Sequence, residues 1–146
     1  MFSMKYIAKN LEETQKIARD FVNGIKPKEK SATIVGLYGD LGAGKTSFTQ
    51  GVALALNIDE NVASPTFVIE KIYKLKKQNF EQLIHIDAYR LEKSEELLSL
   101  NWKEIVSNPT NIILIEWPER VADIMPDHIH INFSHISEEG REIEII

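Results

Sequence analysis

The sequence predicts an α/β domain in which parallel strands form the centre of a mixed sheet. Short apolar and β-branched runs alternate with segments that have the spacing of amphipathic helices. A glycine-rich turn joins one of these runs to a helix. Hairpin-like strand pairs occur in the middle and at the end of the chain, which favours antiparallel strands at the sheet edges.

The first expected elements are a short strand, Lys5–Ala8, and a helix over 11–24. Asn10 is expected to cap this helix, because Glu13 stands three residues later in a capping-box arrangement. Gly24 and Pro27 are expected to end it.

The remaining elements follow from apolar patterning and from proline positions. Strands are expected at Ala32–Tyr38, 66–75, 83–87, 112–115, 129–133 and 142–146, the last two around a turn at Gly140. Helices are expected at 45–56, at 94–106 with Ser94 as a possible cap, and from Pro118 to a stop at Pro126.

Length and composition fit one soluble globular domain, 1–146. The chain has 43% hydrophobic and 27% charged residues, which argues against wholesale disorder. It has no cysteine, so disulfides, thiolate zinc sites, iron–sulfur clusters and cysteine nucleophiles are excluded. The net charge of −5 makes nucleic-acid binding by charge alone a poor expectation.

A cytoplasmic location is expected. The longest apolar run, Val52–Leu56, is far shorter than the roughly 20 residues of a membrane-spanning helix. The first residues also lack the apolar region and cleavage site of a signal peptide.

The strongest motif is the segment from Gly39 to Thr46, which reads Gly39-Asp40-Leu41-Gly42-Ala43-Gly44-Lys45-Thr46 and matches G-x-x-x-x-G-K-[ST]. Its glycines let backbone N–H groups face an anion, and the following helix directs the positive end of its dipole there. Lys45 adds a charge for the β and γ phosphates, and the Thr46 hydroxyl can bind Mg²⁺. Ser47 could contact the α phosphate. The alternative is a glycine-rich turn without a ligand.

Two carboxylates end apolar strands. Asp87 ends Leu83-Ile84-His85-Ile86-Asp87, and Glu116 ends Ile112-Ile113-Leu114-Ile115-Glu116. Either could hold Mg²⁺ or its waters, although the usual acid is Asp. Both could instead be solvated strand ends.

Other candidates have ordinary alternatives. Thr66, in Ser64-Pro65-Thr66-Phe67, could touch Mg²⁺ or the γ-phosphate or belong to a simple turn. Arg90 and Arg120 could bind phosphate or form surface ion pairs. Trp117 could lie beside a nucleotide or in the core.

Further features favour plainer interpretations. No Asn-Lys-x-Asp segment for guanine is present, so ATP is favoured over GTP. His128 and His130 could suggest a metal, but their spacing places them on one face of a strand without an evident acidic third ligand. The lysines could face RNA or form a solvated edge strand. They are Lys71, Lys74, Lys76 and Lys77.

Several motifs together resemble one family. They are Gly39–Thr46 with Phe48, Ser64-Pro65-Thr66-Phe67, His85-Ile86-Asp87-Ala88-Tyr89-Arg90-Leu91 and Ile115-Glu116-Trp117-Pro118-Glu119. In this order and spacing they resemble the TsaE (YjeE) proteins, bacterial P-loop ATPases needed to make threonylcarbamoyladenosine in tRNA. The fold that the resemblance implies is a P-loop NTPase three-layer α/β sandwich, with a mixed, mainly parallel central sheet and antiparallel edge strands.

The resemblance also implies roles. Thr46 and Glu116 would hold Mg²⁺, Asp87 would place water or sense the γ-phosphate, and Thr66 matches a switch-like threonine. Trp117 would lie close to the nucleotide. The adenine would rest between the start of the Asn10 helix and the C-terminal strands.

The implied activity is ATP hydrolysis to ADP and phosphate, weak alone and raised by TsaD-like and TsaB-like partners. Contact with tRNA would then come only through the complex. One alternative is a small P-loop kinase, although four scattered arginines and no lid-sized segment disfavour it. Another is a nucleotide-gated binding module with incidental hydrolysis.

Overall fold

The computed structural model describes residues 3–59 and 69–146. Within these residues, hydrogen bonds order seven strands as β1-β7-β6-β2-β5-β4-β3. The strands are β1 (Met4–Ala8), β2 (Thr33–Tyr38), β3 (Glu70–Lys74), β4 (Gln82–Asp87), β5 (Asn111–Glu116), β6 (Ile129–His135) and β7 (Arg141–Ile145). The helices are α1 (Leu11–Asn23), α2 (Lys45–Ala55), α3 (Ser94–Leu98), α4 (Trp102–Ser107) and the 3₁₀ helix η1 (Pro118–Ile124).

The described chain forms two compact units, with β2 divided between them. The first contains β1, α1, Leu37 and Tyr38 of β2, α2, most of β6 and β7. The second contains the rest of β2, then β3 to β5, α3, α4 and η1. The expectation of a single domain stays a prediction.

In the first unit, α1 begins as its sequence predicts. The Asn10 side chain accepts a hydrogen bond from the Glu13 N–H at 2.9 Å, and Glu13 Oε1 accepts from the Lys9 N–H at 3.2 Å. The helix ends at Asn23, with Gly24 as its C-cap. Both boundaries are therefore set by local sequence.

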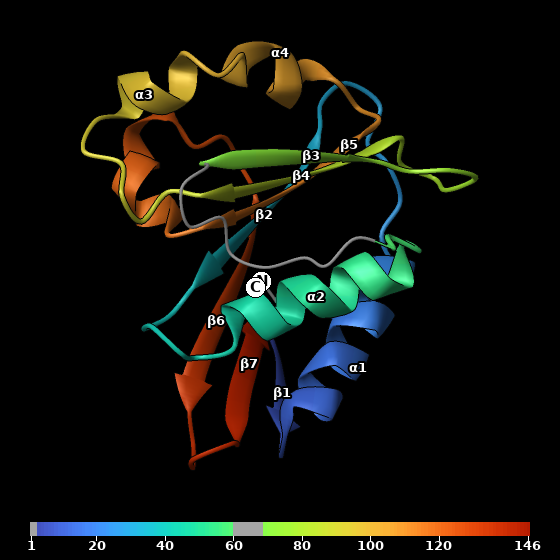
Figure 1. The fold of residues 1–146 in the computed structure, drawn as a ribbon, viewed down its shortest axis with the longest axis vertical. Helices are drawn as coiled ribbons and strands as arrows, with labels where there is room; N and C mark the ends of the chain where they lie inside the picture. The colour runs from blue at the N-terminus through green and yellow to red at the C-terminus, as the bar shows by residue number, and fades with distance from the viewer. Residues whose placement is uncertain (1–2, 60–68) are drawn as a thin grey trace. The chain divides into compact units, whose positions relative to one another are not determined.

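Helices α1 and α2 lie side by side (Figure 1). Gly51 of α2 makes this close approach possible. A Cβ atom at Gly51 would lie 2.7 Å from the Gln15 carbonyl oxygen and 2.8 Å from the Ala18 side chain of α1. Any larger residue would push the two helices apart.

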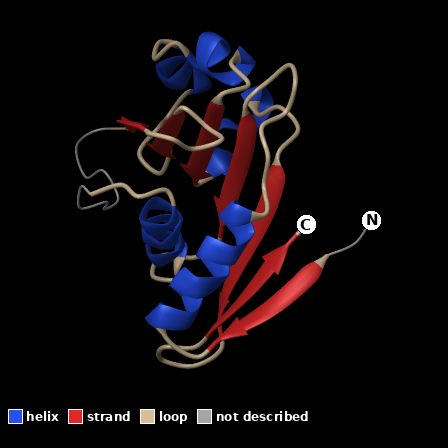
Figure 2. Cartoon of the chain, turned by 90° about the vertical axis from the view of Figure 1, so that its right-hand side faces the viewer, coloured by secondary structure: helices blue, strands red, loops and turns tan. Residues whose placement is uncertain are grey.

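An antiparallel ribbon completes the first unit. Strand β7 pairs antiparallel with β1, placing Tyr6 opposite Ile143, and with β6, placing Phe133 opposite Ile143. Figure 2 shows β1 and β7 as neighbouring arrows. This pairing confirms an antiparallel edge of the mixed sheet.

In the second unit, β4 pairs parallel with β5 and antiparallel with the edge strand β3. All six residues of β5 are buried, as expected for a central strand with both faces covered. On β3, Lys71 and Lys74 are exposed, which agrees with a solvated edge strand. The expected strand 66–75 is shorter within the described residues, since β3 begins at Glu70.

The expected helix 94–106 is two helices instead. Asn101 separates α3 from α4 with φ 62° and ψ 31°, a left-handed conformation that breaks the run of helical backbone and that Asn tolerates better than most residues. The cap also differs, because Lys93 occupies the N-cap position and the Ser94 hydroxyl donates to the Asp123 carboxylate of η1. The Glu96 carboxylate accepts from the Lys93 N–H at 3.2 Å.

No helix in residues 3–59 and 69–146 is both long and apolar enough to cross a membrane.

Candidate functional site

The glycine-rich segment is the connection between β2 and α2. Its three glycines all have positive φ: 146° at Gly39, 76° at Gly42 and 110° at Gly44. L-amino acids with side chains rarely adopt these conformations, so glycine is strongly favoured at each position. The sequence motif therefore corresponds to a specific backbone path.

Packing adds a second requirement at Gly39. A Cβ atom there would lie 2.7 Å from the Phe133 carbonyl oxygen on β6 and 3.1 Å from the Phe133 Cβ. Strand β6 therefore lies directly against the start of the loop, which leaves no room for a side chain.

Lys45 is the first residue of α2 and is 4% exposed. Its Nζ donates a hydrogen bond to the Gly39 carbonyl oxygen at 2.5 Å. The side chain thus folds back to the beginning of the loop, and the ammonium charge is fixed beside its backbone.

The start of α2 lacks a side-chain cap. Gly44 is the N-cap residue and has no side chain that could accept from the first-turn N–H groups. Those groups and the helix dipole attract an anion, while Thr46 and Ser47 follow Lys45 in the same turn, half-buried. This donor set fits nucleotide phosphates, and the Thr46 hydroxyl is a suitable oxygen ligand for Mg²⁺.

The tip of the loop is open to solvent. Asp40 and Gly42 are exposed, and Leu41 is 65% exposed. Ala43 is buried, and its N–H donates to the Asp40 carbonyl oxygen at 3.1 Å. The Ala43 amide is thus used within the loop itself.

The two candidate carboxylates belong to the second unit and are neighbours. Asp87 and Glu116 end the parallel strands β4 and β5, where their Cα atoms are register partners. The carboxyl ends of parallel strands are the usual place for binding residues in α/β folds. The structure thus brings together two acids that lie 29 positions apart in the sequence.

Glu116 is buried rather than solvated, with 3% exposure. Its Oε2 lies 2.7 Å from Nε2 of His85, which is completely buried on β4. The interpretation of Glu116 as a solvated strand end is therefore wrong. Its partner His85 was visible only as a polar residue interrupting an apolar strand.

Asp87 is half-buried, and its Oδ1 accepts from the Tyr89 N–H at 3.0 Å. This bond turns the chain sharply after β4, as an aspartate side chain commonly does at such a position. The carboxylate is thus oriented by its own loop.

Trp117 follows Glu116 with φ 60° and ψ 47°, an uncommon conformation for a bulky residue. Its ring centroid lies 5.0 Å from that of Tyr89 at a tilted angle. The Arg120 guanidinium stacks over Tyr89 at 5.4 Å. Backbone strain of this kind often occurs at functional sites, so the segment after β5 is a site candidate in its own right.

Other sequence candidates have different places. Thr66, with its Ser64-Pro65-Thr66-Phe67 segment, lies outside the described residues. Arg90 is exposed in the turn after β4. His128 precedes β6 rather than lying in it, whereas His130 is in β6 and stacks on Tyr38 with ring centroids 3.6 Å apart.

One buried residue was not among the sequence candidates. Arg141, the first residue of β7, is 8% exposed and donates through Nη2 to the Gly42 carbonyl oxygen at 3.0 Å. The only sequence signal was an arginine directly after a glycine turn. Its contact with the glycine-rich loop of residues 39–44 joins two residues that lie 99 positions apart.

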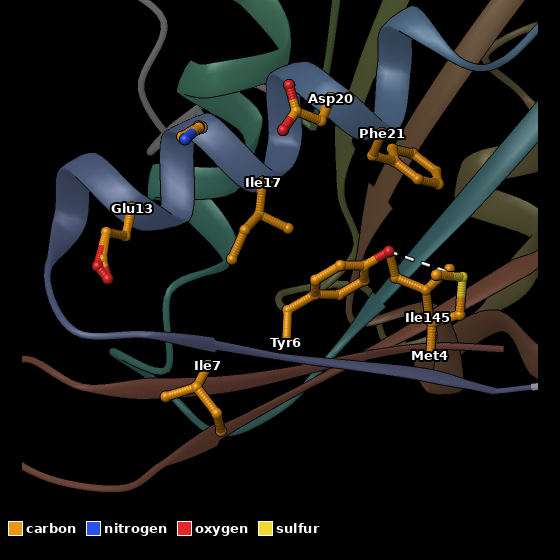
Figure 3. A pocket seen from close by; sticks show the side chains of 9 residues that line it. Met4, Tyr6, Ile7, Glu13, Ile17, Asp20, Phe21 and Ile145 are labelled. Atoms are coloured by element: carbon orange, nitrogen blue, oxygen red, sulfur yellow. Dashed lines mark hydrogen bonds between the residues drawn. The ribbon is translucent and has the colours of Figure 1, made fainter.

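A cavity of about 430 Å³ lies between α1 and the β1–β7 pair in the first unit. Tyr6 of β1 and Ile17 and Phe21 of α1 face one another in it (Figure 3). The resemblance places adenine between the start of the Asn10 helix and the C-terminal strands. Glu13 of α1 and Ile145 of β7 line this cavity, whereas Asn10 does not. The place of the adenine stays a prediction.

Comparisons with known proteins agree with these features. The family model for "Threonylcarbamoyl adenosine biosynthesis protein TsaE" matches residues 8–143. The chain is 37% identical to the Rickettsia felis tRNA threonylcarbamoyladenosine biosynthesis protein TsaE over 142 residues, which cover 96% of this chain and 78% of that protein. It is 35% identical to the Bacillus subtilis protein of the same name over 144 residues, covering 98% and 85%.

A solved structure is also similar. It is described as the crystal structure of Bacillus subtilis YdiB and superposes with a TM-score of 0.77 at 28% identity, covering 99% of this chain and 84% of the other. The expected fold class, a P-loop NTPase-like α/β fold with a mixed sheet, is confirmed by this match and by the strand order. With the family model covering nearly the whole sequence, the chain belongs to the TsaE family of threonylcarbamoyladenosine biosynthesis proteins.

Proposed function

We propose that the protein is a Mg²⁺-dependent ATPase subunit that serves threonylcarbamoyladenosine synthesis in tRNA. The observation that carries the proposal is the loop of residues 39–44, whose three positive-φ glycines lead into a helix end without a side-chain cap. With Lys45 beside it, this loop has the donors and the charge that a polyphosphate requires.

In the proposed reaction, water attacks the γ-phosphorus in line with the departing ADP. Lys45 and the loop N–H groups stabilise the negative charge that develops on the phosphate oxygens. Thr46 and Glu116 are the proposed ligands of Mg²⁺, which supplies further charge neutralisation when bound.

The burial of Glu116 and its hydrogen bond to His85 support a ligand role, because metal-binding carboxylates are commonly oriented by a second hydrogen-bonded group. Asp87 is more accessible, which supports its proposed role in placing the attacking water or sensing the γ-phosphate. Thr66 is proposed to contact the same region, and Trp117 is proposed to lie beside the nucleotide.

TsaD-like and TsaB-like proteins are the proposed partners. A net charge of −5 gives the chain little attraction for tRNA by itself, so the tRNA is proposed to be reached through the complex. ATP hydrolysis is accordingly proposed to be slow in the isolated subunit and faster in the complex.

The test is a phosphate-release assay with ATP and Mg²⁺, on the chain alone and mixed with TsaD-like and TsaB-like proteins from the same cell. The proposal expects phosphate to go to water at a rate that the partners raise. The same assay is run on Lys45→Ala, which removes the proposed phosphate-binding charge. Its matched control is Lys103→Ala, a change of an exposed lysine on α4.

Transfer of phosphate to an acceptor would indicate a kinase instead. Partner binding that depends on ATP or ADP, without any turnover, would indicate a nucleotide-gated binding module. Either result contradicts the ATPase proposal.

A further inference from the structure

Arg141 stands at the junction of two loops. It begins β7 directly after the β6–β7 turn and is 8% exposed. Through Nη1 it donates to the carbonyl oxygens of Ser137 at 3.3 Å, Glu138 at 3.2 Å and Gly140 at 2.8 Å. These three bonds fold the turn around the guanidinium.

The same guanidinium contacts the glycine-rich loop of residues 39–44, which we call the phosphate loop. Its Nη2 donates to the Gly42 carbonyl oxygen at 3.0 Å. Its aliphatic part lies beside Gly44, where an added Cβ would be 3.5 Å from Arg141 Cγ. One side chain therefore contacts the loop at two of its three glycines.

This contact fixes a peptide unit of the loop at both ends. The Gly42 carbonyl accepts from Arg141, and the Ala43 N–H of the same peptide unit donates to the Asp40 carbonyl at 3.1 Å. Because a peptide unit is planar, holding both ends sets the orientation of the backbone that leads into Gly44 and Lys45. The N–H groups offered to an anion depend on that orientation.

The buried charge of Arg141 also favours a bound anion nearby. A guanidinium stays protonated in proteins, so a full positive charge is buried here. Among the described residues, its hydrogen-bond partners are backbone carbonyls, it has no carboxylate partner, and Nε has no acceptor. Carbonyl dipoles compensate such a charge only in part. A phosphate bound nearby would therefore lower the free-energy cost of burying the guanidinium.

We propose that Arg141 is a positioning residue of the phosphate loop. It holds the loop in its anion-binding conformation and adds a positive charge at Gly42 to the charge that Lys45 supplies. The inference rests on the proposed function, with the diphosphate of a nucleotide as the ligand. Arg141 is not proposed as a catalytic residue, because its Nη atoms are hydrogen-bonded to backbone carbonyls.

The test measures binding of MgADP by calorimetry to the wild-type chain and to three variants. Arg141→Gln removes the charge and the two Nη donors of the guanidinium, and Arg141→Lys keeps the charge. Ser137→Ala is the matched control, because the Ser137 hydroxyl accepts from the Gly140 N–H at 2.9 Å within the same turn but does not contact Gly42. Thermal unfolding without ligand is measured for each variant in parallel.

Arg141→Gln is expected to weaken MgADP binding about 10-fold or more, as loss of a charge-assisted bond and a buried charge would do. Arg141→Lys is expected to recover part of that affinity, and Ser137→Ala to bind within about 2-fold of wild type even if its unfolding temperature falls. If Arg141→Gln does not fold, Arg141→Lys decides, with an expected loss of about 3- to 10-fold.

Wild-type affinity in a folded Arg141→Gln, or in Arg141→Lys when it is the only folded variant, would overturn the inference while leaving the proposed function intact. Equal losses in Arg141→Gln and Ser137→Ala would also overturn it, because turn integrity alone would then explain both. Failure of the wild-type chain itself to bind MgADP or MgATP would refute the proposed function, and the role of Arg141 with it.

Discussion

Nε2 of His85 lies 2.7 Å from Oε2 of Glu116, and both side chains are buried on neighbouring parallel strands. In the register of these strands His85 is paired with Leu114, two residues before Glu116, so the contact is a diagonal one across the sheet. A buried carboxylate needs such a partner, because removing it from water is costly unless hydrogen bonds replace those lost. The geometry holds one Glu116 oxygen in a defined position at the end of β5.

Replacing His85 by Ala is expected to destabilise the fold by about 2–4 kcal/mol, because it removes a partner of a buried carboxylate and leaves a void. Urea unfolding followed by circular dichroism measures the change. His135→Ala is the control, since His135 is exposed and its loss should cost less than about 0.5 kcal/mol. Equal effects of the two substitutions would contradict a structural role for the His85–Glu116 contact.

Gly39→Ala is expected to destabilise the protein by about 2 kcal/mol or more and to abolish binding of ADP. An alanine would have to adopt a backbone conformation with φ 146°, and its Cβ would lie 2.7 Å from the Phe133 carbonyl oxygen. Gly24→Ala is the matched control. Gly24 has φ −89° and its nearest contact to an added Cβ is 3.6 Å, so that change should be neutral or stabilise by up to about 1 kcal/mol.

Thermal unfolding measures the stability of both glycine variants, and calorimetry measures their binding of ADP. A Gly39→Ala protein that binds ADP as well as wild type would show that the loop conformation is not needed for the ligand.

Lys45→Ala and Asp87→Ala are expected to fail at different steps. Without the Lys45 ammonium, binding of ATP should weaken about 10- to 100-fold, and turnover should disappear. Asp87→Ala should bind ATP normally and lose hydrolysis, since the proposed role of this carboxylate concerns water rather than the phosphate chain. Calorimetry and phosphate release in the presence of partners measure the two properties. Normal hydrolysis by Asp87→Ala would remove it from the catalytic assignment.

Glu70→Gln is expected to stabilise the protein near neutral pH. Partial burial raises the pKa of Glu70 above its ordinary value, and Oε1 has no hydrogen-bond partner within the described chain. A raised pKa in the folded state means that stability is lost as the pH rises through that pKa and the group ionises. The gain from Gln should therefore be present at pH 7 and fade toward about pH 3, where Glu70 is largely protonated in both states.

Urea midpoints at several pH values measure this difference. Glu104→Gln is the matched control, because it makes the same change at an exposed position of α4. A constant difference between Glu70→Gln and wild type at all pH values would contradict the role of burial.

Local patterns were sufficient for much of the fold. The capping box at Asn10, the glycine stop at Gly24 and the apolar strand 112–115 each depend on neighbouring residues, so they could be predicted without the tertiary structure. The single helix expected over 94–106 is wrong, because Asn101 has a left-handed conformation between α3 and α4. Leu97 of α3 and Trp102 of α4 both lie in the core of the second unit, a relationship that helical spacing alone does not show.

The glycine-rich loop of residues 39–44 could be predicted from local sequence, because glycines at fixed spacing followed by Lys45 act through backbone freedom and one nearby charge. The distant groups that support the candidate site are visible only once the chain is folded. Strand pairing brings His85 to Glu116, and the β6–β7 turn brings Arg141 to Gly42. Contacts of this kind depend on strand register and burial, which arise from the whole chain rather than from the residues adjacent in sequence.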